Sequence, residues 1–248
     1  MICGMMAVIT DIRKSILNLV FPLHCLACRA PVEESAVWQV CGRCLDDIRP
    51  NPRPWCRRCG RSVDFADALC RECRKMPGRH FKRNYSAYLY DGALKECIHK
   101  FKYGGISRLS GLFSSLLIDF IKDNPEILKD IDLLVPVPLG KNRLRERGYN
   151  QSSMLTRPIS EEFGVLSVDA LAKKKSTPPQ SELKRESRLI NLKGAFEMRP
   201  DISVNGKNIL IIDDVFTTGS TINECASVLK DAGAGRIYSL TLARGHAA

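Results

Sequence analysis

The chain has 248 residues, of which 44% are hydrophobic, and its formal net charge is +11. This composition is ordinary for a soluble globular protein, and the length allows one α/β domain or a medium domain with a small one. The positive charge is not confined to a single basic tail. Two separate segments, Phe21 to Arg83 and Lys141 to Arg199, each carry 13 Lys and Arg against 7 Asp and Glu. A distributed positive charge favours phosphate-rich partners, either nucleotides or nucleic acid.

Residues 1–20 are expected to form an amphipathic helix. Apolar side chains recur there at helical spacing, and Asp11, Arg13 and Lys14 interrupt the apolar stretch. The interruption argues against an export signal and a membrane span, so no stable membrane insertion is expected. A helix docked on its own protein is the favoured interpretation, with contact at a membrane surface as the alternative. The expected location is the cytoplasm, where cysteines stay reduced and available to a metal.

Residues 21–76 form a cysteine-rich segment that is too short to fold on hydrophobic burial alone. Eight of the 11 cysteines stand in four Cys-x-x-Cys pairs, separated by 12, 11 and 10 residues. Two intervening residues let a turn aim both sulfurs at one ion, and two turns complete a tetrahedral site of four thiolates. The segment is therefore predicted to be a double zinc ribbon with two structural Zn²⁺ ions, whose ligands are Cys25, Cys28, Cys41, Cys44, Cys56, Cys59, Cys70 and Cys73.

The spacing does not fix which pairs share a metal. Sequential pairing, first with second and third with fourth, is the default, and interleaved pairing stays open. Disulfides conflict with a reducing compartment, and four redox motifs in a row would be unusual. Four sulfurs per ion leave no open coordination position, so these sites are expected to hold structure and not to catalyse.

Residues 84–248 contain apolar strands that alternate with helices, after a basic linker over residues 74–84. Such alternation predicts an α/β fold with a doubly wound, mostly parallel sheet that is covered on both faces. The expected strands are residues 85–90, 133–137, 209–212 and 237–242. The expected helices are residues 94–101, 109–121, 152–163 and 222–232.

The segment from Ile209 to Thr221 is an apolar strand that runs into two acids, then into a loop of hydroxyls and glycine, and then into a helix. Open α/β sheets bind ligands beyond the carboxyl ends of their strands, where Asp213 and Asp214 can accept hydrogen bonds from ribose hydroxyls. The helix N-terminus favours a phosphate dianion. A simple helix cap is the alternative, and it explains only one hydroxyl. The candidate phosphate-binding residues are Thr217, Thr218, Gly219, Ser220 and Thr221.

This segment, residues 211–221, resembles the phosphoribosyl-pyrophosphate (PRPP) motif of type I phosphoribosyltransferases, with Phe216 where an aliphatic residue is more usual. Residues 135–141, Val-Pro-Val-Pro-Leu-Gly-Lys, are similar to the strand and pyrophosphate loop of amidophosphoribosyltransferase-like members. Gly148-Tyr149-Asn150-Gln151 is similar to the competence protein F (ComF/GntX-like) family, which also carries an N-terminal module of cysteine pairs. The resemblance covers the chain from about residue 12 onward.

The resemblance implies a type I phosphoribosyltransferase fold that binds PRPP, or another ribose 5-phosphate ligand, together with Mg²⁺. It implies that residues 173–193 form the loop that covers the active site in true transferases, where Arg188 and Lys193 would face pyrophosphate as catalytic residues. It also assigns the pyrophosphate loop to Pro138, Leu139, Gly140 and Lys141.

No nucleobase or amine pocket can be recognised in the sequence. The favoured expectation is therefore a binding role: a ComF-like accessory factor in DNA uptake or utilisation, which binds single-stranded DNA and acts with a cytoplasmic helicase-like partner. One alternative is an active phosphoribosyltransferase with an unknown acceptor. The other is a regulator that senses PRPP.

Overall fold

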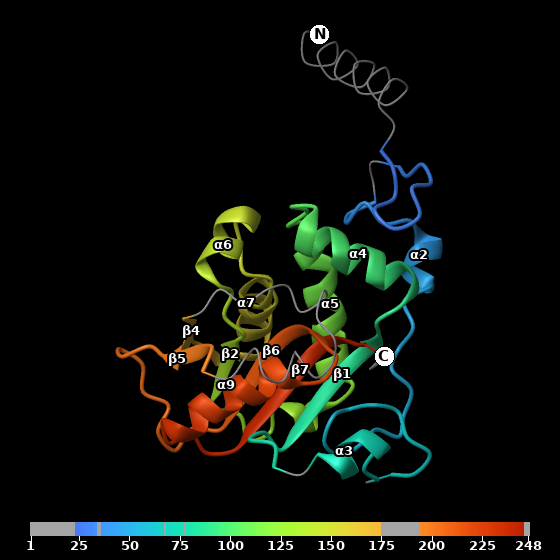
Figure 1. The fold of residues 1–248 in the computed structure, drawn as a ribbon. Coiled ribbons are helices and arrows are strands. Elements are labelled where there is room, and N and C mark those ends of the chain that lie inside the picture. Colours follow the sequence, from blue (N-terminus) through green and yellow to red (C-terminus); the bar gives the residue numbers. More distant parts are fainter. Residues whose placement is uncertain (1–22, 34–35, 67, 77, 175–193, 246–248) are drawn as a thin grey trace.

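The computed structural model describes residues 23–33, 36–66, 68–76, 78–174 and 194–245. The helix expected over residues 1–20 lies outside these ranges. A parallel sheet of five strands, in the order β1-β7-β6-β2-β3, forms the centre (Figure 1). The expected α/β fold with a parallel sheet is confirmed. The strands of this sheet are β1 (Arg83–Leu89), β2 (Leu133–Pro136), β3 (Leu166–Ser167), β6 (Ile209–Phe216) and β7 (Ile237–Arg244).

Helices cover both faces of this sheet because its strands are apolar on both sides. On β6, Leu210 and Ile212 enter one core, whereas Ile209 and Ile211 enter the other. This is the alternation that a pleated strand imposes. The first core contains side chains of α4 (Gly92–Tyr103), α5 (Leu109–Lys122) and α7 (Gln151–Phe163), and the second contains those of α9 (Ser220–Asp231).

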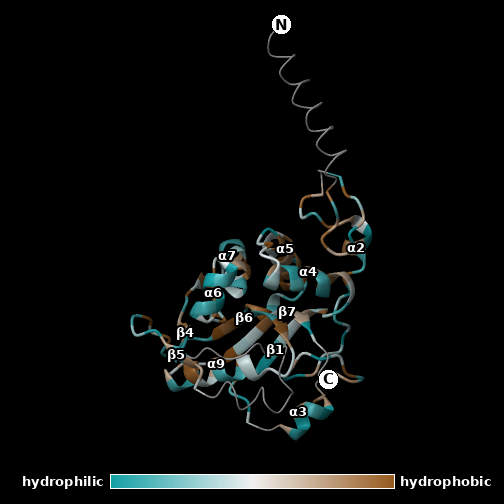
Figure 2. Cartoon of the chain, turned by 45° about the horizontal axis from the view of Figure 1, so that its top comes forward, coloured by the Kyte–Doolittle hydropathy of each residue, from teal (hydrophilic) through white to brown (hydrophobic). Residues whose placement is uncertain are grey.

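The remaining elements are short. Residues Leu171–Lys173 (β4) and Phe196–Met198 (β5) form an antiparallel pair, and Lys141–Arg147 (α6) has no buried side chain. Figure 2 accordingly shows α6 largely hydrophilic and the central strand β6 largely hydrophobic. None of the helices in the described part of the chain is long and apolar enough to cross a membrane. The other short helices are α2 (Gly42–Asp46), α3 (Arg71–Lys75) and the 3-10 turn η1 (Pro125–Ile127).

Two differences from the sequence expectation concern the ends of the strands at the candidate site. The strand expected to end at Ile212 continues to Phe216, because β7 keeps pairing with it as far as Phe216 opposite Arg244. Asp213 and Asp214 therefore lie within β6 and not in a loop after it. Helix α6 was not expected, since a short helix with a single apolar residue, the exposed Leu144, carries no apolar periodicity.

The cysteine-rich segment divides into two modules on opposite faces of the sheet (Figure 1). The first cysteine module, residues 23–48, joins the core of α4 and α5 through Cys25 and Cys44. The second cysteine module, residues 54–76, joins the core of α9, which contains all four of its cysteines.

The segment between the modules runs along the edge strand β1. Pro50 pairs with Tyr88 in antiparallel fashion, and the Asn51 amide donates to the Ala87 carbonyl at 2.9 Å. The edge of the sheet is thus covered by the chain that joins the two modules.

Candidate ligand site and metal centres

The eight paired cysteines gather into two groups of four. Cys25, Cys28, Cys41 and Cys44 form the first group, and in each group the four sulfurs lie within 4.8 Å of one another. The grouping is sequential, as expected by default, and interleaved pairing is excluded. The second group consists of Cys56, Cys59, Cys70 and Cys73, all of which are buried.

Each module builds its group from a similar turn. A residue in the left-handed conformation follows the first pair, Arg29 at φ 65° in the first module and Gly60 at φ 69° in the second. Backbone amides then point at the leading sulfurs, with Cys41 N 3.3 Å from Cys25 Sγ and Cys70 N 3.3 Å from Cys56 Sγ. Amide donors of this kind stabilise thiolates, which are the form that binds metal.

The thiols of each group affect one another's pKa. Burial opposes the ionisation of Cys25, yet amides of Cys41, Cys28 and Ala27 together lower its pKa to about 6. In the second group, hydrogen bonds with Cys59 and Cys73 lower the pKa of Cys56, and hydrogen bonds with Cys56 and Cys59 raise that of Cys73. Four adjacent sulfurs cannot all be charged without a positive ion among them. The two groups therefore fit structural Zn²⁺.

The phosphate loop, residues 217–219, joins β6 to α9. Gly219 adopts φ +79°, and a Cβ there would lie 2.3 Å from Arg79 Nη1 and 2.3 Å from Phe216 Cζ, so only glycine fits. The Thr218 and Ser220 hydroxyls lie 2.7 Å apart at the start of α9. The motif thus forms a tightly packed turn at a helix N-terminus, which is suited to an anion.

The acid pair at the end of β6 is held by two other elements. Lys102 Nζ of α4 lies 2.7 Å from Asp214 Oδ1, and the Ser152 hydroxyl of α7 donates to Asp213 Oδ1 at 3.0 Å. Burial and the adjacent Asp214 raise the pKa of Asp213 to about 7, although Lys102 opposes this shift. The two adjacent carboxyl groups therefore share one lysine, and the charge of Asp214 opposes the ionisation of Asp213.

The predicted pyrophosphate loop lies, like the acid pair, at the carboxyl ends of the parallel strands. Because β2 and β6 pair in parallel, with Pro136 opposite Ile212, their carboxyl ends lie side by side. Gly140 is the N-cap of α6, and Lys141 is exposed. The structure therefore brings Pro138–Lys141 and Asp213–Thr221 together at the carboxyl ends of the parallel strands. The predicted catalytic residues Arg188 and Lys193, and residues 175–193 of the expected covering loop, lie outside the described residues.

The ends of that expected loop are held near α9. The Lys174 amide donates to the Ala195 carbonyl at 2.9 Å, and the Gly194 amide donates to Glu224 Oε1 of α9 at 2.7 Å. The chain therefore returns to the helix that carries the phosphate loop.

Four residues at the site were not among the candidates from sequence. Lys102 and Ser152 touch the acid pair, as described above. Arg79 donates to the Thr218 carbonyl at 2.8 Å, and Arg244 donates to the Phe216 and Thr217 carbonyls at 2.7 Å each. Their separation from the motif along the chain explains why no local pattern identified them.

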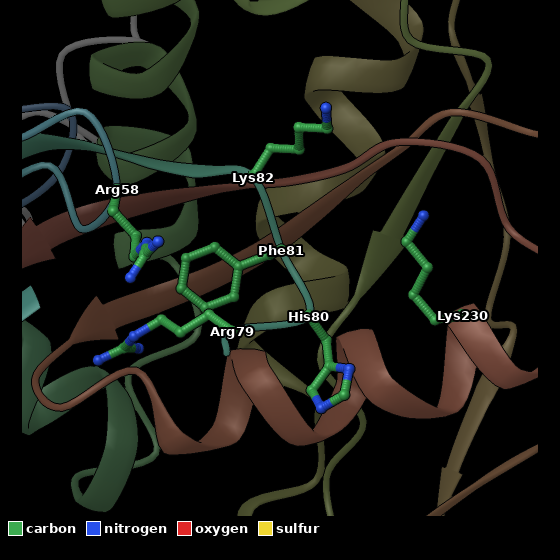
Figure 3. Close-up of a pocket in the computed structure, with 6 residues that line it drawn as sticks. All are labelled: Arg58, Arg79, His80, Phe81, Lys82 and Lys230. Carbon is green, nitrogen blue, oxygen red and sulfur yellow. The ribbon is translucent and has the colours of Figure 1, made fainter. Parts of the chain in front are cut away.

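A basic pocket of about 560 Å³ lies beside α9, between this helix and the second cysteine module (Figure 3). Phe81 at its base is buried, whereas His80 and Lys82 are exposed. No acidic side chain is among the described residues that line it, so its potential favours anions. The lining residues are Arg58, Arg79, His80, Phe81, Lys82 and Lys230.

Family models match both parts of the chain. The Double zinc ribbon domain matches residues 16–74, and the Phosphoribosyl transferase domain matches residues 150–248. Among solved structures, a hypoxanthine phosphoribosyltransferase from Staphylococcus aureus is 17% identical and covers 54% of this chain and 64% of its own, with a TM-score of 0.35. The fold assignment accordingly rests on the sheet order and the family model.

Full-length relatives carry both parts together. "Competence protein ComFC" of Bacillus subtilis is 30% identical over 243 residues, which cover 90% of this chain and 95% of the relative. "DNA utilization protein YhgH" of Escherichia coli K12 is 30% identical over 229 residues, covering 91% and 99%. "Competence protein F" of Haemophilus influenzae is 29% identical over 230 residues, covering 90% and 98%. With this identity over nine tenths of its length, the chain belongs to the competence protein F (ComF) family.

Proposed function

We propose that this protein binds PRPP, or a related ribose 5-phosphate ligand, and serves as an accessory factor in DNA uptake or utilisation. One observation carries the ligand assignment: the Asp213–Asp214 pair and the phosphate loop share one edge of the sheet with Pro138–Lys141. The DNA role is suggested by the relatives, which are named as a competence protein and a DNA utilization protein. A cytoplasmic location and a cytoplasmic helicase-like partner are parts of the same proposal.

Each part of the ligand has a proposed contact. The ribose hydroxyls donate to Asp213 and Asp214, the 5-phosphate binds at the loop and α9 N-terminus, and pyrophosphate binds at Pro138–Lys141. Arg188 and Lys193 are proposed to face pyrophosphate. Mg²⁺ would accompany the ligand and neutralise its phosphates, and the acid pair already accommodates a cation, Lys102 Nζ.

Calorimetry with PRPP and Mg²⁺ tests the ligand assignment. The double substitution Asp213→Asn with Asp214→Asn should abolish Mg²⁺-dependent binding, because neutral amides accept ribose hydroxyls more weakly than carboxylates do. The matched control is Asp130→Asn. Asp130 is an exposed acid just before β2, at the amino ends of the parallel strands, and it pairs with Arg236. Unchanged affinity in the double variant would reject the site.

The basic pocket favours single-stranded DNA as a second ligand. Basic side chains without acidic neighbours attract a phosphate backbone, and such binding weakens steeply with salt. Filter binding should therefore fall between about 50 and 200 mM salt. Lys82→Glu should weaken it further, whereas Lys95→Glu, an exposed lysine of α4 on the other face, should have little effect. No binding at the lowest salt would remove this part of the proposal.

A transferase activity is the alternative proposal. It is supported by the match of residues 150–248 to the Phosphoribosyl transferase domain, and burial beside Asp214 raises the pKa of Asp213 to about 7. Incubation with PRPP, Mg²⁺ and a panel of bases and amines, with pyrophosphate release as the readout, tests it. Turnover with any acceptor identifies an enzyme. Binding without turnover, together with a PRPP-dependent change in DNA affinity, identifies a sensor.

A further inference from the structure

Arg244 is an unusual residue of the molecule because its guanidinium is buried without a carboxylate partner in the described part of the chain. It closes β7 with 6% of its surface exposed. Its Nη1 donates to the carbonyls of Phe216, Thr217 and Gly245, each at 2.7 Å. A buried cation needs a compensating negative charge as well as hydrogen bonds.

The compensating charge lies in the second cysteine module. Arg244 Nη2 is 3.9 Å from Cys59 Sγ. Four thiolates around one Zn²⁺ carry a net negative charge. Arg244 therefore bridges the second cysteine group and the carbonyls of the phosphate loop, and a Zn²⁺ ion held by four thiolates there would supply the compensating negative charge.

Arg79 holds the next peptide group of the phosphate loop, that of Thr218. Its Nη2 donates to the Thr218 carbonyl. The guanidinium of Arg79 lies 5.9 Å from the centre of the Phe216 ring, and that of Arg244 lies 4.9 Å from the same ring. The space between the module and the loop is nearly closed, with a volume of about 10 Å³. The loop is thus packed directly on the second cysteine module.

The orientation of these carbonyls determines the orientation of the loop amides. In a trans peptide the carbonyl and the following N–H point in opposite directions. Because Phe216, Thr217 and Thr218 turn their carbonyls towards the two arginines, the amides of residues 217–219 point the other way. Those three amides have no partner among the hydrogen bonds of the described residues. Successive unpartnered amides of this kind form an anion-binding concavity.

We propose that Arg244 is a positioning residue that couples the second cysteine module to the phosphate loop, so that the loop amides face the ligand phosphate only when this module is folded around its metal. The inference rests on the proposed binding of PRPP. The first cysteine module supplies the contrast: it packs on α5, where Gln39 accepts a hydrogen bond from Arg108, and has no described contact with the loop.

The test compares the full-length protein with four variants. Arg244→Gln should weaken PRPP binding in calorimetry about tenfold or more, because two loop carbonyls lose a charged donor. Arg244→Lys should retain part of the affinity, since it keeps the buried positive charge. Cys59→Ser in the second group should reduce affinity similarly. Arg108→Gln, which removes the exposed contact between the first module and α5, should bind as the wild type does, with zinc content measured in every variant.

Hydrogen exchange of the Gly245 and Asn223 amides, which donate to the Phe216 and Gly219 carbonyls at 2.9 Å each, gives a readout of the loop that does not depend on PRPP. Arg244→Gln and Cys59→Ser should both speed this exchange, and Arg108→Gln should not. Equal exchange in all variants overturns the coupling, even if PRPP binds. If the wild type fails to bind PRPP while the exchange pattern is as expected, the ligand assignment fails and the coupling stands. Should Arg244→Gln not fold, Arg79→Gln, at a half-buried position, provides the same comparison.

Discussion

At the scale of single residues, Asp213 determines how the site responds to pH. Burial and the charge of Asp214 raise its pKa to about 7, so the folded chain keeps this proton at pH values where an exposed carboxyl has lost it. The stability gained from the neutral form is present at low pH and is lost as pH rises through about 7. A ligand that donates hydroxyls to the carboxylate has the opposite preference, because it favours the ionised form.

PRPP affinity should therefore increase between pH 6 and pH 8 as Asp213 ionises. Calorimetry across this range measures the effect. Asp213→Asn should flatten most of the dependence and leave only the part that belongs to the ligand phosphates, whose second pKa is near 6. An equally steep dependence in Asp213→Asn would show that Asp213 is not the titrating group.

Lys102 compensates the acid pair and is a second residue whose removal should be measurable. Its ion pair with Asp214 is mostly shielded, with side-chain exposures of 22% and 8%. Lys102→Met leaves a buried carboxylate without its cation, so the free energy of unfolding should fall by about 2 kcal/mol or more. Urea denaturation measures this loss. The double variant Lys102→Met with Asp214→Asn should recover part of it, and simple additivity would contradict the pairing.

At the scale of elements, the second cysteine module depends on a single glycine. A Cβ on Gly60 would lie 2.6 Å from the Asn84 carbonyl, and its φ of +69° is unfavourable for other residues. Gly60→Ala should thus cost about 1–3 kcal/mol in urea denaturation. Gly42, in the first module, has open space around its Cβ position, so Gly42→Ala should change stability by less than about 1 kcal/mol. Equal effects at the two positions would argue against the close contact.

The sequence predicted the elements whose signals are local. Regular Cys-x-x-Cys pairs and an acid pair before Thr-Thr-Gly are short patterns, and both correspond to compact features of the structure. The partners of those features come from distant segments: Ser152 lies 61 residues from Asp213, and Arg79 lies 139 residues from Thr218. Such contacts depend on how the sheet orders its strands, and no periodicity within one segment encodes that order.

At the scale of the whole molecule, the two metal groups should contribute to global stability, because each belongs to one of the two cores. The protein is expected to bind two Zn²⁺ ions per chain. Removal of both by a strong chelator should lower the thermal unfolding midpoint by about 5 °C or more. Zn²⁺ should restore the midpoint, and Mg²⁺ should not. An unchanged midpoint in metal-free protein, verified by elemental analysis, would contradict this expectation.

The strip of chain around Pro50 that lies along β1 has a practical consequence for dissecting the protein. A fragment that begins at residue 84 would retain the PRPP motif but would lose the strip and its pairing with Ala87 and Tyr88. Its outermost strand would then offer unpaired amides and carbonyls to neighbouring molecules, which is a common route to aggregation. A fragment designed to keep the catalytic or binding site should therefore begin before Arg49. A fragment that begins later is expected to be insoluble.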